Sequence, residues 1–146
     1  VHRSFEVKIK APESSVNKVI HHYWNNKHDY EKAVYDNGWY KAGFRAFGNF
    51  ELIDDTIPPI ITPVGFKNGM NTVKLKRIAF VVRDATDELR NFRAELDGKW
   101  LRFSNDKGRT FIYVFDEHCL PGQHHLKITV EDVAGNKVEK EYEFVR

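Results

Sequence analysis

Short segments of alternating apolar and polar residues, separated by tight-turn sequences, recur along this chain of 146 residues. Residues 4–10 alternate in this way, and residues 125–131 do the same near the other end. An Asn-Gly pair at 37–38 and an Asp-Gly pair at 97–98 fall between such segments. These dipeptides tolerate the positive φ angles of tight hairpin turns. The pattern predicts consecutive antiparallel hairpins and an all-β fold.

One segment allows a second interpretation. Val16, Ile20 and Tyr23 fall at helical spacing, and Ser14 or Ser15 could cap a helix there. The alternative is a strand over residues 19–24. Tyr, Trp and His are weak helix formers, and the flanking segments are β-like. We therefore favour the strand.

A stiff segment divides the chain. Pro58 and Pro59 cannot continue the centre of a sheet, so with Asp55 they mark an interdomain linker. We predict two small β-sandwich units. Residues 57–146 have about seven strand candidates, which is typical of an immunoglobulin-like sandwich. Residues 1–56 form a β-rich unit with a small core, which leans on the second unit or is the end of a sandwich domain truncated upstream.

Composition excludes several classes of protein. Lys plus Arg number 23 and Asp plus Glu 21, so the net charge of +2 argues against a nucleic-acid partner. Membrane spans need about 20 consecutive apolar residues, and the sequence contains no such run. The single cysteine, Cys119, excludes an internal disulfide framework and a cysteine-rich zinc site.

Two motifs carry a family resemblance. The first is R-x-F-G-x-F at 45–50, followed by D-T-x-P-P at 55–59. The second is G-x-H-x-L-x-I-x-x-x-D-x-A-G-N at 122–136, which resembles the ending of many bacterial immunoglobulin-like domains. Together they resemble the tandem β-domains at the C-terminal end of some Gram-negative envelope proteins. Those proteins carry a lysostaphin-type zinc peptidase domain upstream.

The resemblance implies a non-catalytic spacer or binding module in the periplasm, at the outer membrane or at the cell surface. It would position an upstream peptidase against peptidoglycan or an envelope protein, and any zinc would belong to that upstream domain. The first alternative is a free-standing adhesin-like or glycan-binding module. The second is a hydrolase fragment whose active site uses upstream residues. A chain that begins at Val1 fits a truncated protein, whose unpaired sheet edges favour strand-addition dimers.

The histidines do not form the ligand pattern of such a peptidase, because the sequence has no His-x-His. Neighbouring residues of a strand point to opposite faces, so His21-His22 and His124-His125 cannot each hold one zinc ion. Cys119 lies beside His118, but a small buried residue is the simpler interpretation. We therefore predict neither a catalytic residue nor a metal site in this chain.

Three aromatic residues are binding candidates. Trp39, Tyr40 and Trp100 lie on expected strands beside turns, where exposed rings could stack on sugars or dock a partner chain. The opposing interpretation is that these rings belong to the core. We favour the core for Trp100 and, less strongly, for Trp39.

Several loop residues carry smaller expectations. Asp132 can accept backbone N–H groups across the last loop, where Gly135 can supply a positive φ. Arg45 either pairs with Asp54 or Asp55 or remains solvated. A weaker interpretation groups Asp84, Asp87 and Glu88 into an oxygen-rich loop that suits calcium. Adjacent carboxylates such as Asp116-Glu117 are more often simply solvated.

Overall fold

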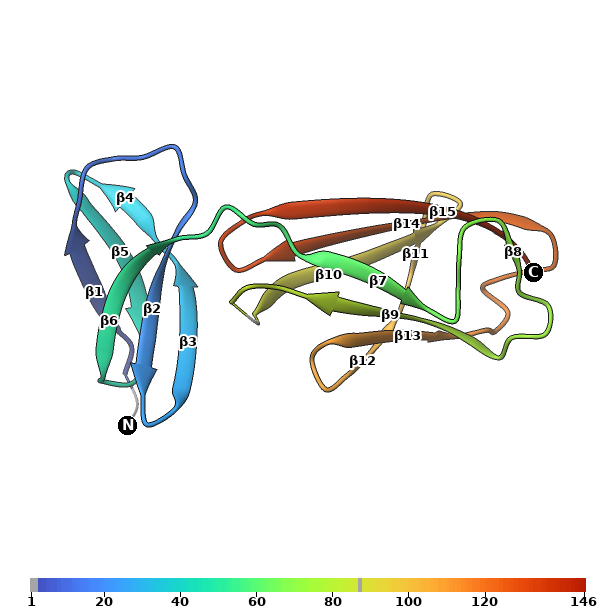
Figure 1. Cartoon of the computed structure of the whole chain (residues 1–146), viewed down its shortest axis with the longest axis horizontal. Helices are drawn as coiled ribbons and strands as arrows, with labels where there is room; N and C mark the ends of the chain where they lie inside the picture. The colour runs from blue at the N-terminus through green and yellow to red at the C-terminus, as the bar shows by residue number, and fades with distance from the viewer. Residues whose placement is uncertain (1–2, 87) are drawn as a thin grey trace.

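The computed structural model describes residues 3–86 and 88–146, and within them every regular element is a β-strand (Figure 1). The all-β prediction is therefore confirmed. None of these described residues belongs to a helix long and apolar enough to cross a membrane. The strands form two sandwich units that follow one another along the long axis of the molecule.

The N-terminal unit packs two three-stranded sheets, of order β1-β5-β4 and β3-β2-β6, against each other. Its core holds Ile20, Tyr40 and Phe44. The strand predicted over 19–24 is confirmed as β2, which lies between two partners and so is the best buried of its sheet. The strands are β1 (Phe5–Lys10), β2 (Lys18–Trp24), β3 (Lys27–Lys32), β4 (Val34–Asp36), β5 (Trp39–Phe44) and β6 (Asn49–Asp54).

The C-terminal unit packs a sheet of order β12-β13-β9-β7 against one of order β11-β10-β14-β15-β8. The strand pairs are antiparallel except for the short parallel pair of β15 with β8, and the two sheets form an immunoglobulin-like sandwich, as predicted. Phe80, Leu126 and Phe144 lie at the centre of its core. The strands are β7 (Ile60–Val64), β8 (Met70–Asn71), β9 (Arg77–Arg83), β10 (Leu89–Leu96), β11 (Lys99–Leu101), β12 (Ser104–Asp106), β13 (Thr110–Val114), β14 (Gln123–Asp132) and β15 (Lys137–Val145).

The predicted hairpin turns have the expected backbone geometry. Asn37 and Gly38 have φ angles of 46° and 90°, and Asp97 and Gly98 have 51° and 83°. Two successive positive φ angles twist a two-residue turn in the sense that suits antiparallel strands. These turns set the registers of the β4–β5 and β10–β11 pairs.

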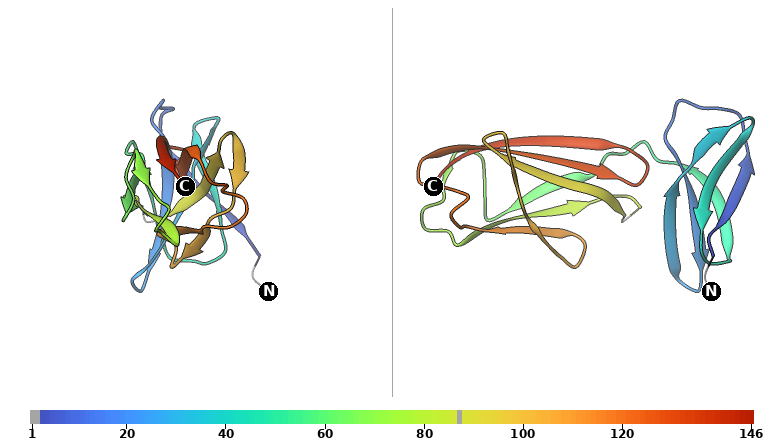
Figure 2. Two further views of the ribbon diagram at one scale, coloured as in Figure 1. Left: turned by 90° about the vertical axis from the view of Figure 1, so that its right-hand side faces the viewer. Right: turned by 180° about the vertical axis from the view of Figure 1, so that it is seen from behind.

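The two units meet through loops of the second unit. Both views in which the long axis is horizontal show the β14–β15 and β9–β10 loops directed toward the β3 side of the first unit (Figures 1 and 2). Residues 55–59 connect β6 to β7. Within this linker Asp55 and Pro59 are buried, whereas Pro58 is exposed.

The prediction that Trp100 belongs to the core is wrong, because its side chain is 63% exposed. Trp100 lies on the short edge strand β11, where Leu101 is the residue that points into the core. Trp39 is 40% exposed, so the core interpretation fails there as well, and its neighbour Tyr40 is the buried residue. In a strand with a period of two, a shift of one residue exchanges the inner and outer faces.

Strands β1, β3, β4 and β6 lie at the edges of the N-terminal sheets. Edge strands present unpaired backbone groups to other chains. The strand-addition dimer stays a prediction.

Candidate functional site

A hydrogen-bonded network joins the two units. Asn136, in the β14–β15 loop, accepts a hydrogen bond from Nδ2 of Asn17 at 2.8 Å through its Oδ1. Its own Nδ2 donates to the carbonyl oxygen of Asp55 at 3.0 Å. The backbone N–H of Asp55 in turn donates to the carbonyl of Asn17 at 2.9 Å. One side chain of the second unit therefore binds both the entry to β2 and the exit from β6.

Asp132, the last residue of β14, positions this asparagine. Its carboxylate is 0% exposed and accepts hydrogen bonds from the backbone N–H and the Nδ2 of Asn136, at 2.8 and 2.9 Å. Gly135 allows the turn with a φ of +97°. The prediction that Asp132 accepts backbone N–H groups across this loop is confirmed.

Three carboxylates lie close together next to the Asn17–Asn136–Asp55 network. One oxygen from each of Asp55, Asp84 and Asp132 lies within 4.8 Å of the other two. Asp84 follows β9, and its Oδ2 accepts hydrogen bonds from the Thr86 N–H at 3.1 Å and the Thr86 hydroxyl at 2.6 Å. Oδ1 of Asp55 accepts the N–H of Ile57 at 3.2 Å. The cluster thus draws on the linker and on two strand ends of the second unit.

The second oxygen of two of these groups is left without a partner. Oδ2 of Asp55 and Oδ1 of Asp84 are buried and accept no hydrogen bond from a described residue. Burial raises the pKa of both carboxyls. Hydrogen bonds from Ile57 and Thr86 lower the pKa of Asp55 and of Asp84, respectively, whereas the charge of Asp84 raises the pKa of Asp55 and that of Asp132 raises the pKa of Asp84.

A second group of acidic side chains lies where the β9–β10 loop meets β3. Glu88, from the β9–β10 loop, faces Asp29 and Glu31 of β3 and accepts a hydrogen bond from the backbone of Tyr30. Burial and then the charge of Asp29 raise the pKa of Glu88 to about 7. Negative charge therefore gathers on both sides of this contact.

The calcium loop proposed from the sequence is not assembled as expected. Asp84 and Glu88 face different partners, the first Asp132 and the second Asp29. Asp87 lies outside the described residues. What the sequence did not reveal is that Asp84 joins Asp55 and Asp132. The only local signal is Thr86 two residues after Asp84, a spacing typical of an Asx turn.

The two aspartates expected to pair with Arg45, Asp54 and Asp55, contact other groups. Lys18 forms an ion pair with Asp54. Asp55 faces the acidic cluster. Arg45 is exposed in the segment after β5, in agreement with the solvated alternative.

The three aromatic binding candidates are not brought together. Tyr40 is 3% exposed, and its hydroxyl accepts the Ser14 N–H at 2.9 Å, which removes it from any binding surface. Trp39 lies on β5 of the first unit and Trp100 on β11 of the second. Trp100 and Arg102 line a depression of about 470 Å³ in which Asp116 and His118 also lie.

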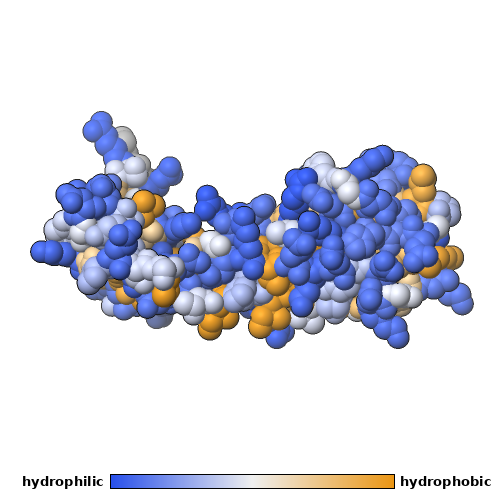
Figure 3. All heavy atoms as spheres, turned by 90° about the horizontal axis from the view of Figure 1, so that it is seen from above, coloured by the Kyte–Doolittle hydropathy of each residue, from blue (hydrophilic) through white to orange (hydrophobic). Residues whose placement is uncertain are grey.

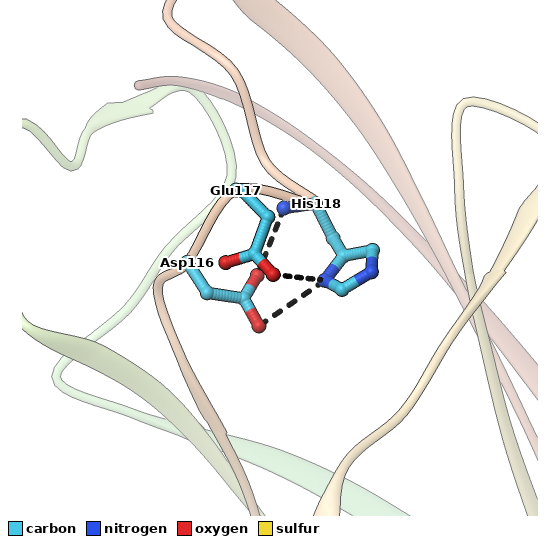
Figure 4. A group of neighbouring side chains, drawn as sticks. All are labelled: Asp116, Glu117 and His118. Atoms are coloured by element: carbon cyan, nitrogen blue, oxygen red, sulfur yellow. Dashed lines mark hydrogen bonds and ion pairs between the residues drawn. The ribbon is translucent and has the colours of Figure 1, made fainter.

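Asp116, Glu117 and His118 form an exposed group at the edge of that depression (Figure 4). Oδ1 of Asp116 accepts the N–H of His118 at 3.0 Å and the hydroxyl of Tyr113. Nδ1 of His118 lies 3.3 Å from Oδ2 of Asp116 and 3.9 Å from Oε1 of Glu117. These contacts hold a turn, and water reaches all three side chains, so nothing here requires a cation.

The paired histidines point to opposite faces, as predicted. Nδ1 of His21 lies 2.7 Å from Oε1 of Glu51, and its Nε2 lies 2.8 Å from Nδ1 of His28. Nε2 of His22 lies 3.0 Å from the Phe47 carbonyl, on the core side. Because the two nitrogens of His21 are directed to different partners, this group does not converge on one ion.

Comparisons with known proteins give no family. No protein-family model matches the chain, and neither does any curated protein. Among solved structures, the endo-β-1,4-mannanase from Thermotoga petrophila aligns with 62% of this chain at 12% identity and a TM-score of 0.49. The chain spans only 20% of that enzyme.

A second solved structure covers more of the chain. The fibronectin(III)-like modules of Clostridium thermocellum CbhA align with 96% of it, and the alignment covers 84% of those modules at 9% identity and a TM-score of 0.43. Both TM-scores lie below 0.5, so neither likeness assigns a function.

Proposed function

We propose that this chain is a non-catalytic spacer module that holds whatever is attached to its two ends in a set orientation. The observation that carries the proposal is the Asn17–Asn136–Asp55 network, in which one side chain binds both ends of the first unit's connection to the second. Domains joined by a linker move relative to one another unless their interface restrains them. A flexible tether would need no such network.

The linker supports the same conclusion. Only residues 55–59 separate β6 from β7, and two of them are prolines, which restrict the backbone. Pro59 and Asp55 are buried, so the segment packs against the units. A short, packed, proline-containing linker favours a fixed orientation.

The proposed setting is the cell envelope, where the module would position an upstream peptidoglycan peptidase. Support comes from the family resemblance, whose D-T-x-P-P and D-x-A-G-N motifs supply Asp55, Asp132 and Asn136 to one junction. Cys119 is buried, and burial raises the pKa of its thiol, which suits packing rather than nucleophilic attack. Zinc would belong to the upstream domain.

Small-angle X-ray scattering tests the spacer. We expect one relative orientation of the two units to fit the scattering of the wild-type chain. Asn136→Ala should broaden the distance distribution, because the bonds to Asn17 and Asp55 are lost, while circular dichroism stays unchanged. Asn105→Ala, at an exposed position of β12, is the matched control. A wild-type curve that needs many orientations would overturn the proposal.

A second candidate function is glycan binding on the second unit. The observation that favours it is the exposed indole of Trp100 beside a depression with polar side chains. Aromatic rings next to hydrogen-bonding groups are typical of sugar-binding surfaces.

Co-sedimentation with peptidoglycan sacculi tests this candidate. We expect saturable binding that Trp100→Ala abolishes and that Trp39→Ala, on the other unit, leaves unchanged. Binding that is absent, or that survives Trp100→Ala, would remove this candidate and leave the spacer in place.

A further inference from the structure

The acidic cluster at the junction lacks compensation for its charge. Asp55 is 5% exposed and contributes one oxygen to the cluster, and its Oδ2 accepts no hydrogen bond. Oδ1 of Asp84 is in the same situation. Buried ionised carboxylates are normally paired with a cation, hydrogen-bonded or bound to a metal. Among the described residues, neither oxygen is paired with a cationic side chain or accepts a hydrogen bond.

Basic side chains do not fill this role. Lys18, the first residue of β2, pairs with Asp54 instead. The Lys32 side chain approaches Gly135 in the β14–β15 turn. Within the described part of the chain, the ion pairs include none between the three clustered carboxylates and a Lys, Arg or His side chain. The missing positive charge must come from outside the chain or from protons.

We propose that Asp55, Asp84 and Asp132 bind one Ca²⁺ ion at the junction of the two units. The proposal replaces the sequence-based expectation of no metal site in this chain. It deepens the spacer function, and its mechanical consequence rests on that function, whereas ion binding itself does not.

The donor set suits a hard cation. All three ligands are carboxylate oxygens, which Ca²⁺ and Mg²⁺ prefer, whereas zinc sites usually include histidine nitrogen or cysteine sulfur as well. Calcium–oxygen distances are about 2.3–2.6 Å, so two ligands on opposite sides of one ion lie about 5 Å apart. The three oxygens all lie within 4.8 Å of one another, so they are close enough to share one such ion. Mg²⁺ needs shorter distances and stricter octahedral geometry, so we expect it to bind more weakly.

The position of the ion would couple the two units. Asp55 belongs to the linker, Asp84 follows β9, and Asp132 ends β14. The same Asp132 holds Asn136, which binds Asn17 of the first unit. An ion on these carboxylates would therefore remove the repulsion among them and tie the linker to the second sandwich.

Isothermal titration calorimetry of the chelator-treated chain with CaCl₂ tests the site. We expect one ion per chain. Asp84→Asn, which keeps the shape and removes one charge, should weaken binding by about tenfold or more. Asp55→Asn should do the same. Glu117→Gln, in the exposed Asp116–His118 group, is the matched control and should bind as the wild type does.

Thermal unfolding in EDTA and in calcium shows whether each variant is folded and whether calcium stabilises it. Calcium should raise the unfolding midpoint of the wild type and of Glu117→Gln, and much less that of Asp84→Asn. If Asp55→Asn does not fold, the half-buried Asp84 still gives the answer. No heat and no shift up to about 10 mM calcium, above the weakest extracellular calcium modules, would overturn the site. Wild-type affinity in both folded Asn variants would do so too.

The two proposals fail separately. Absent calcium binding with a single orientation in scattering removes the ion and leaves the spacer, because the Asn136 network needs no metal. Intact calcium binding with many orientations removes the spacer and leaves the site.

Discussion

At the scale of single residues, the unusual feature of the junction is that several carboxyl groups are buried close to one another. Asp55 and Asp84 have raised pKa values because they are taken out of water next to other acids. Glu88 is also partly buried next to acids, because Asp29 and Glu31 of β3 face it. Glu88 and His28 line one depression at this contact. These residues oppose the association of the units at neutral pH unless a proton or a cation neutralises them.

The Glu88 carboxyl makes stability depend on pH. Its pKa rises from 4.5 to about 7 on folding, so the folded chain holds the proton more tightly than the unfolded chain. Its stabilising contribution is complete below about pH 4.5 and is lost as the pH rises through about 7. Asp55 and Asp84 act in the same direction.

We expect the unfolding midpoint in EDTA to fall between pH 5 and pH 8 by less in Glu88→Gln than in the wild type. Differential scanning calorimetry across this range gives the slopes, and Glu117→Gln serves as the exposed control. Equal slopes for the wild type and Glu88→Gln would contradict the assignment.

At the scale of elements, period-two strands decide which side chains are available for binding. Tyr40 and Leu101 point into the two cores, so the adjacent Trp39 and Trp100 point outward. The face drawn in Figure 3 is mainly hydrophilic, with hydrophobic areas that are small and separate. Exposed aromatic residues in such a setting are candidate contacts for a small ligand rather than one large apolar interface.

The loop between β5 and β6 depends on Gly48. A Cβ at this position would lie 2.6 Å from Nε2 of His22 and 3.1 Å from the carbonyl oxygen of Tyr23. The Tyr23 oxygen is backbone of the central strand β2, and a shift of the His22 ring would disturb its contact with the Phe47 carbonyl. This close approach explains the glycine in the R-x-F-G-x-F motif.

We expect Gly48→Ala to lower the free energy of unfolding by about 1–3 kcal/mol, because the added methyl group overlaps with atoms of His22 and Tyr23. Urea unfolding followed by circular dichroism measures it. Gly43→Ala is the matched control, since the nearest atom to its Cβ would be the Phe5 carbonyl oxygen at 3.9 Å. A Gly48→Ala variant as stable as Gly43→Ala would show that the loop adapts.

At the scale of the whole molecule, two separate cores meet through a narrow polar contact. One core is built from residues of 5–52 and the other from residues of 61–144. Because no apolar cluster of the described residues joins them, the relative orientation depends on Asn136, the linker and the acidic groups. This is why a single Asn136→Ala substitution is expected to change the scattering curve without changing either fold.

The all-β architecture, the hairpin turns and the linker follow from the sequence because they are local properties. Alternation sets the strand faces, Asn-Gly and Asp-Gly set the turns, and Pro58 and Pro59 end the first unit. Asp132 could also be foreseen, since its bond to the Asn136 N–H spans only four residues. Which aromatic residue faces outward was not predictable, because a shift of one residue in register reverses the assignment.

Only the tertiary structure brings Asp55, Asp84 and Asp132 together. They are separated by tens of residues, and each alone has the appearance of an ordinary loop aspartate. Their burial and their unpartnered oxygens arise from the packing of the linker against two strand ends of the second sandwich. The sequence by itself therefore determined the strands, the turns and the division into two units, and the packing of those units decided where charge is buried.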